Sequence, residues 1–84
     1  MIFHDEKNHT FKLAAPEGEA YLEYSRNGNA VTALHTVVPD AMSGKGIAGE
    51  LTEAFYQWVS DNRFILKSEC SYVSAWLKRN KKTL

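Results

Sequence analysis

The hydrophobic pattern changes its period at Pro39, and this change constrains the fold more than any other feature of the sequence. Before Pro39, apolar and polar residues alternate, as they do from Ala20 to Tyr24, and a period of two is typical of strands with one buried face. After Pro39, apolar residues recur every three or four positions, which is the spacing of one helix face. Proline also lacks the amide hydrogen that would continue a strand ladder. We therefore expect an α+β fold in which the strands come first.

The strand half of the chain predicts two hairpins. Short runs at about residues 2 to 5 and 9 to 13 flank a polar, turn-rich connection. The second hairpin joins Glu19 to Ser25 with Ala30 to Val38, and the pair Asn27-Gly28 between them favours a tight turn.

The second half predicts two helices with a strand between them. We expect the first helix over about residues 44 to 60, a short buried strand at Phe64 to Leu66, and a last helix that begins near Ser71. The order of elements is then ββββαβα in one domain that spans residues 1 to 84. The first helix is predicted by a stripe of apolar residues: Ile47, Leu51, Ala54, Phe55, Trp58 and Val59.

The balance of charge narrows the class of ligand. Ten basic and ten acidic residues give a net charge of zero, which argues against a protein held to nucleic acid by bulk charge. The two parts of the chain differ, because residues 1 to 40 carry 3 − 6 = −3 and residues 41 to 84 carry 7 − 4 = +3. An anionic ligand is therefore expected to bind the second half.

The remaining composition excludes other classes of protein. The lone Cys70 and three scattered histidines offer no paired metal-ligand spacing, so we expect no metal site and no internal disulfide. No apolar run approaches the roughly 18–20 residues that a membrane span needs. We expect a cytoplasmic protein without a membrane partner.

A glycine-rich turn lies between Pro39 and the predicted helix, in the segment Ser43-Gly44-Lys45-Gly46-Ile47-Ala48-Gly49. Glycines let the backbone approach a phosphate closely, and the first amides of a helix have no partner within it. The structural alternative is a plain connection between a strand and a helix. The segment also matches G-x-G-x-x-G, but a dinucleotide fold needs repeated βαβ units, and this chain has room for one crossover.

Three segments carry a family resemblance: His35-Thr36-Val37-Val38-Pro39, Gly44-Lys45-Gly46-Ile47-Ala48 and Cys70-Ser71-Tyr72-Val73. They look like the small Yjdj-type branch of the Gcn5-related N-acetyltransferases, and the resemblance covers nearly the whole chain. The cofactor signature of that family is Gln or Arg, two residues, Gly, one residue, then Gly or Ala. Gly46 and Ala48 match it, and Ser43 stands where the family usually has Arg or Gln.

The resemblance implies a compact mixed sheet with an acetyl-CoA cleft between two splayed parallel strands, at Thr36 to Val38 and Phe64 to Leu66. The amides of pantetheine are expected to bond to the backbone of Val37 and Val38, much as an added strand would. The pyrophosphate of coenzyme A is expected at the turn, on Gly44, Lys45, Gly46, Ile47 and Ala48.

Acetyl transfer to an amine needs a nucleophile, stabilisation of the oxyanion and a proton for the departing thiolate. Cys70 lies before a predicted helix, where the helix dipole favours a thiolate, and matches the cysteine of the family; a covalent acetyl-cysteine is the functional interpretation and a small buried hydrophobe the structural one. His35 is a candidate base, or a histidine that only fixes the sheet. Tyr72 is a candidate proton donor, or an aromatic residue of the core.

We therefore expect an acetyl-CoA-dependent enzyme that acts on an unidentified amine, either a small molecule or a protein, as a monomer or weak homodimer. One alternative is a non-catalytic acyl-CoA-binding or regulatory module, which would bind the cofactor without releasing free thiol. The other is a small interaction domain, which would not bind the cofactor.

Overall fold

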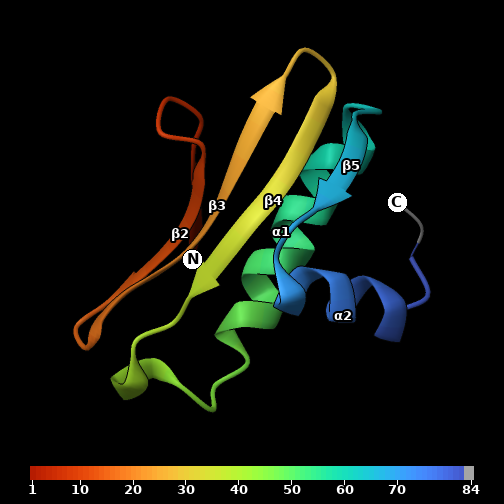
Figure 1. Ribbon diagram of the computed structural model, residues 1–84. Helices are drawn as coiled ribbons and strands as arrows, with labels where there is room; N and C mark the ends of the chain where they lie inside the picture. The colour runs from red at the N-terminus through yellow and green to blue at the C-terminus, as the bar shows by residue number, and fades with distance from the viewer. Residues whose placement is uncertain (83–84) are drawn as a thin grey trace.

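The structure is a computed structural model that describes residues 1–82, and its elements follow the predicted order ββββαβα (Figure 1). A short 3-10 helix, which the sequence did not predict, follows Pro39. The elements are β1 (Ile2–Asp5), β2 (Thr10–Ala15), β3 (Gly18–Asn27), β4 (Ala30–Val37), the 3-10 helix η1 (Asp40–Met42), α1 (Ile47–Asp61), β5 (Ile65–Ser68) and α2 (Ser71–Arg79).

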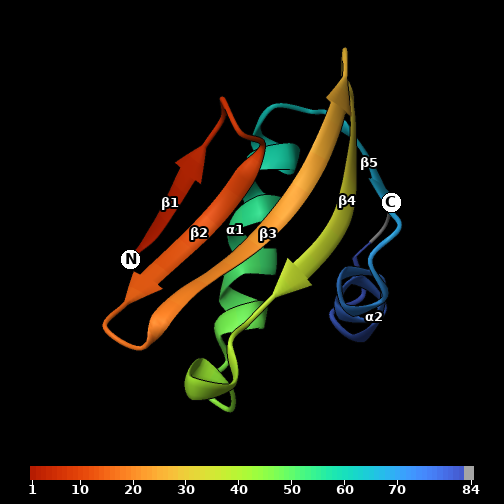
Figure 2. The same ribbon diagram turned by 60° about the vertical axis from the view of Figure 1, so that its left-hand side comes forward.

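The five strands form one sheet in which spatial order equals chain order, β1 to β5 (Figure 2). The first four strands are antiparallel, and both predicted hairpins are confirmed. At the second hairpin Gly28 has a φ of 61°, a left-handed conformation that glycine adopts without strain. β5 returns parallel to β4 after the crossover through α1.

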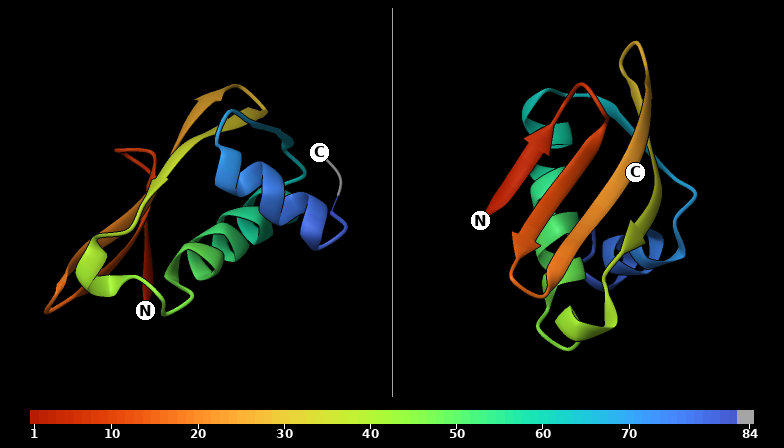
Figure 3. Two further views of the ribbon diagram at one scale, coloured as in Figure 1. Left: turned by 60° about the horizontal axis from the view of Figure 1, so that its bottom comes forward. Right: turned by 90° about the vertical axis from the view of Figure 1, so that its left-hand side faces the viewer.

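Both helices cover the same face of the sheet, and the opposite face is left open (the left panel of Figure 3). The apolar stripe predicted for α1 is confirmed, because Ile47, Leu51, Phe55 and Val59 are buried. On the open face Phe3 remains 63% exposed. The core therefore lies in a single layer between the sheet and the helices, and its buried apolar members from the sheet and α2 are Phe11, Ala20, Leu22, Tyr24, Val31, Ala33, Leu66, Val73, Trp76 and Leu77.

Two predicted boundaries are wrong. α1 begins at Ile47 rather than near residue 44, because Gly44 and Gly46 have φ angles of 77° and 72°, which a right-handed helix does not contain. β5 is the edge of the sheet rather than a fully buried strand, and Ile65 is 59% exposed. Only Leu66 of that strand is buried.

A cluster of aromatic side chains packs between β1, its neighbouring strands and α1. The Nε2 atom of His4 lies 2.6 Å from the hydroxyl of Tyr24, and its ring stacks on Phe11 with 3.9 Å between centroids. Trp58 of α1 meets the same imidazole edge to face. Burial lowers the pKa of His4 below its ordinary value of 6.5 and raises the pKa of Tyr24 to about 12.

No helix in residues 1–82 combines the length and the hydrophobicity that crossing a membrane requires.

Candidate functional site

The glycine turn presents an open, side-chain-free surface in front of α1. A Cβ built on Gly44 or Gly46 meets nothing within 4 Å, so the space before the turn is free. Gly46 is the N-cap of α1 in the left-handed conformation. Gly44 and Gly46, which are separated by one residue, both have a positive φ and no side chain, so a ligand can contact the backbone directly.

The first turn of α1 offers backbone donors to that space. The first helical bond runs from the amide of Glu50 to the carbonyl of Gly46, so the amides of Ile47, Ala48 and Gly49 have no partner within the helix. The Ser43 hydroxyl is not among these donors, because it donates to the Asp40 carbonyl at 2.8 Å. The donor set is therefore backbone, at the positive end of the helix dipole.

Lys45 is held by an acidic residue from another part of the chain. Its Nζ donates to Oε2 of Glu17, in the turn between β2 and β3, at 2.9 Å. This hydrogen bond from Lys45 holds the pKa of Glu17 below its usual range. The cation of the turn and its partner are both solvent-accessible, so an anion arriving at the turn competes with Glu17 for Lys45.

The ladder between β4 and β5 ends partway along β4, and this is where the cleft is expected. The parallel ladder joins Ala30 to Ile65 and ends at the pair Ala33 and Ser68. One further bond runs from the amide of Glu69 to the carbonyl of Ala33. Within residues 1–82, the rest of β4 has a strand partner only on the β3 side, which leaves its other edge available to a ligand.

The position expected for the cleft needs a correction. Its β4 side remains the expected stretch, in which Thr36 and Val37 end β4 and Val38 follows it. Its second wall is not Phe64 to Leu66, because Ile65 and Leu66 pair with the beginning of β4. The segment opposite Thr36 is instead the chain at Cys70, just after β5.

Cys70 is the N-cap of α2 and is a buried member of the core, with 7% of its surface exposed. Its Sγ is 3.6 Å from the Oγ1 of Thr36, so a contact between the two side chains spans the opening. The first helical bond of α2 runs from the amide of Ser74 to the carbonyl of Cys70. The amides of the first turn of α2 are therefore free, as they are in α1.

The structure does not bring His35 to Cys70. Simple alternation would place His35 on the helix-covered face with Val31 and Ala33, but the register with β3 shifts by one residue before His35 and leaves Leu34 as a β-bulge. A bulge of one residue reverses which face later side chains occupy. His35 consequently lies on the open face, where its Nε2 is 2.9 Å from Oε1 of Glu23.

Tyr72 extends from the first turn of α2 toward the first turn of α1. A Cβ at Gly49 would lie 3.4 Å from the Tyr72 hydroxyl, so the glycine makes room for this side chain. The Tyr72 ring is partly buried against the core, and the guanidinium of Arg79 lies 5.9 Å from its centroid. The third glycine of the G-x-G-x-x-G match thus serves the packing of the two helices.

Two contacts at the site were missed by reasoning from the sequence. Thr36 faces Cys70 only because of the bulge at Leu34, and no local signal marks that bulge. Glu17 reaches Lys45 only because the β2–β3 turn folds against the glycine turn. Among residues 1–82, no group of three or more histidine, cysteine or acidic side chains is arranged to hold a metal ion.

Comparisons with known proteins give a consistent result. The family model for the GCN5-related N-acetyltransferases matches residues 10–83. Protein NATD1 of Gallus gallus is 34% identical over 83 residues, covering 95% of this chain and 76% of the relative. Protein NATD1 of Homo sapiens is 32% identical over 82 residues, covering 94% of this chain and 73% of the relative.

A solved structure shares the fold. The NMR solution structure of a GCN5-like protein from Staphylococcus aureus superposes with a TM-score of 0.75 at 23% identity, covering 96% of this chain and 80% of that chain. The chain belongs to the family of the GCN5-related N-acetyltransferases.

Proposed function

We propose that this protein binds acetyl-CoA and transfers the acetyl group to an amine. The observation that carries the proposal is the glycine turn, where Gly44 and Gly46 leave open space in front of the unpartnered amides of α1. Backbone donors at a helix N-terminus suit a phosphate, and coenzyme A carries a pyrophosphate. Membership of the family supports the same cofactor.

The pantetheine arm would bind along the free edge of β4. An extended ligand with amide groups can pair with a strand edge as an added strand does, and Val37 and Val38 lie on the stretch where β5 has diverged. Lys45 would add a charge to the phosphate end once it leaves Glu17. Affinity would then depend on backbone groups and one lysine, and the turn would contribute only when phosphates are present.

The thioester would lie at the contact between Thr36 and Cys70. In the route through the cysteine, the Cys70 sulfur attacks the acetyl carbonyl, the bond from the carbonyl carbon to the CoA sulfur breaks, and the CoA thiolate takes a proton. The amine then attacks the carbonyl carbon of the acetyl-cysteine, the bond from that carbon to the Cys70 sulfur breaks, and the amide forms while the Cys70 thiolate is released and the nitrogen loses a proton. Tyr72, two residues beyond Cys70 and directed toward α1, is the proposed donor of the proton to CoA. In the direct route the amine attacks acetyl-CoA itself, and Cys70 only shapes the cleft.

Calorimetric titration of the wild-type protein with acetyl-CoA, CoA and pantetheine tests the binding proposal. We expect both coenzymes to bind, and pantetheine to bind more weakly because it lacks the phosphates that the turn would hold. Pantetheine binding as tightly as CoA would remove the turn from the site. No heat from either coenzyme up to the millimolar range, with a folded protein, would overturn the cofactor assignment.

A thiol-release assay over a panel of amines then tests the transfer. Acceptor-dependent release of CoA supports an enzyme, whereas binding without release by any amine supports a non-catalytic acyl-CoA-binding module. Cys70→Ala and Cys70→Ser decide between the two routes: loss of turnover with unchanged CoA affinity supports the covalent route, and unchanged turnover supports direct attack by the amine. The affinity measured on the same variants separates a catalytic loss from a distorted cleft.

A further inference from the structure

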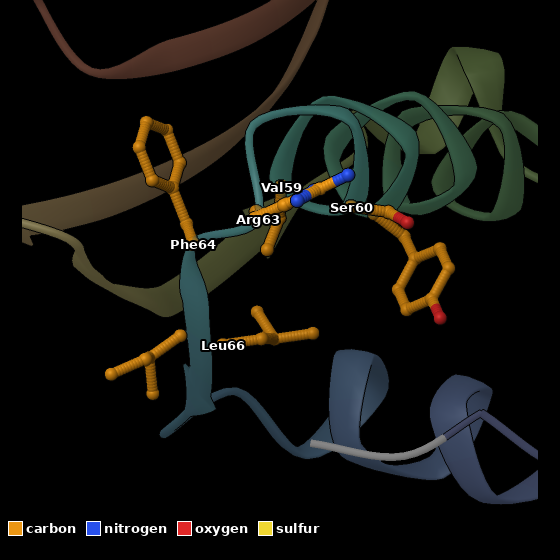
Figure 4. A pocket seen from close by; sticks show the side chains of 7 residues that line it. Val59, Ser60, Arg63, Phe64 and Leu66 are labelled. Atoms are coloured by element: carbon orange, nitrogen blue, oxygen red, sulfur yellow. The ribbon is translucent and has the colours of Figure 1, made fainter.

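A second concave site lies at the other end of α1 from the glycine turn. It is a pocket of about 370 Å³ between the last turns of α1 and the segment from Arg63 to Leu66 (Figure 4). α1 is 15 residues long, which at 1.5 Å per residue separates its two ends by about 22 Å. The pocket is therefore separate from the glycine turn, and none of its lining residues is among those proposed to hold acetyl-CoA.

Both apolar and polar side chains line the pocket, because Ser60 and Arg63 stand beside the apolar and aromatic residues. Tyr56 and Val59 line it from α1, Phe64 lines it from just before β5, and Leu66 lines it from β5 itself. Ile65, which also lines it, is 59% exposed. A pocket of this composition suits an apolar side chain of a partner.

The pocket adjoins a free strand edge. β5 is the last strand of the sheet, and its inward backbone groups are used by the β4 side: the amide of Ile65 donates to Asn29, and that of Glu69 donates to Ala33. In a parallel ladder the intervening residues direct their amides and carbonyls to the other side. Leu66 and Ser68 therefore present donors and acceptors along the outer edge of β5, beside the pocket.

Cations surround this edge. The guanidinium of Arg26 lies 4.3 Å from the centroid of Phe64, and Nζ of Lys82 lies 5.5 Å from that of Tyr56. Arg63 lines the pocket, and Lys67 is exposed on β5 itself. None of the four forms an ion pair with another residue in the part of the chain that the structure describes.

Acidic groups on the neighbouring elements do not cancel this charge. Asp61, at the end of α1, accepts a hydrogen bond from Gln57 on the same helix at 2.8 Å. Glu69 follows β5 and directs its amide to β4. The two acids leave an excess of positive charge along the edge, which favours an anionic partner.

We infer that the outer edge of β5 and its pocket form a docking site for an extended acidic peptide segment of another protein. The peptide backbone pairs with Leu66 and Ser68, an apolar side chain enters the pocket, and carboxylates meet Arg63, Lys67 and Lys82. The strand edge selects this partner over other polyanions, because a nucleic acid has no backbone that can both donate to and accept from a strand.

Fluorescence anisotropy with a labelled peptide of alternating aspartate and valine tests the inference, in the absence of coenzyme A. We expect saturable binding, at least tenfold weaker binding when lysine replaces aspartate, and a similar loss when the peptide amides that face β5 are N-methylated. The first change reverses the charge, and the second removes the strand pairing without changing charge.

A matched pair of charge variants locates the site on the protein. Arg63→Glu should weaken the binding of the acidic peptide by about tenfold, because the variant loses one exposed ion pair and gains one repulsion. Lys7→Glu makes the same charge change in the turn between β1 and β2 and should leave the affinity within about twofold. Equal effects of the two variants, insensitivity to N-methylation, or equal competition by a single-stranded oligonucleotide would each overturn the inference. Because no coenzyme is present, the result is independent of whether acetyl transfer occurs.

Discussion

Replacing Gly46 by alanine tests the glycine turn, with Gly28→Ala as a matched control. Both glycines have a left-handed φ, 72° and 61°, and at both positions a Cβ would meet nothing within 4 Å. The folded-state cost is therefore the backbone strain of an L-residue in that conformation, about 1–2 kcal/mol in each variant. For a domain of this size each kcal/mol lowers the melting midpoint by about 4–8 °C.

The two variants should differ only in coenzyme binding. At Gly46 the new methyl group occupies the space in front of the α1 amides, so at least one hydrogen bond to a charged phosphate is expected to be lost. Such a bond is worth about 1.5–3 kcal/mol, which corresponds to about 10- to 150-fold in affinity. At Gly28 the methyl group lies at the tip of the β3–β4 hairpin, and the affinity for CoA should not change.

Thermal unfolding and calorimetric titration with CoA, both made on the same preparations, measure the two quantities. The expected result is a similar loss of stability in both variants and a loss of affinity for CoA in the Gly46 variant alone. It is refuted if both variants bind CoA as the wild type does, because the open space at Gly46 is then not where the coenzyme lies. Equal losses of affinity would also refute it, since they would reflect global destabilisation rather than the turn.

Three further predictions follow from contacts described above. Glu17→Gln should strengthen CoA binding by about two- to fivefold, the range of an exposed ion pair, because Lys45 is released; unchanged calorimetric affinity would remove Lys45 from the phosphate site. The lowered pKa of His4 means that the unfolded chain takes up a proton that the folded chain resists, so the urea midpoint should fall as the pH drops below 6.5. His4→Gln should flatten that dependence, and an unchanged slope would assign it to other groups. Phe55→Ala should lower the free energy of unfolding by about 3–5 kcal/mol because Phe55 is fully buried, and a loss below about 1 kcal/mol would contradict its place in the core.

The order and type of the elements could be predicted because each has a local cause. The change of period at Pro39 separates strands from helices, and Asn27-Gly28 fixes the second hairpin through the left-handed conformation of Gly28. The start of α1 could not be predicted from the apolar stripe alone. Gly44 lies three residues before Ile47 and so fits the spacing of the stripe, but the positive φ angles of Gly44 and Gly46 keep both glycines outside the helix.

The glycine turn and the contact between Thr36 and Cys70 differ in how far the sequence predicts them. The turn from Gly44 to Ala48 could be found because its residue types have a direct relation to phosphate binding. The pairing of Thr36 with Cys70 could not, because it depends on a bulge at Leu34 that only the alignment of β4 with β3 creates. The same bulge explains why alternation gives the wrong face for His35, whose imidazole lies beside Glu23.

The strand order of the sheet has a consequence for how the cleft is assembled during folding. The antiparallel meander from β1 to β4 closes through short turns, so its contacts are local along the chain. The pairing of β4 with β5 has to close the long crossover through α1, which costs more chain entropy and is expected to come later. The two walls of the cleft thus belong to an early and a late folding unit. A molecule bound to both walls would stabilise the pairing of β5 with β4. It should therefore slow amide hydrogen exchange in β5, which belongs to the late unit, more than in β2, which belongs to the early unit.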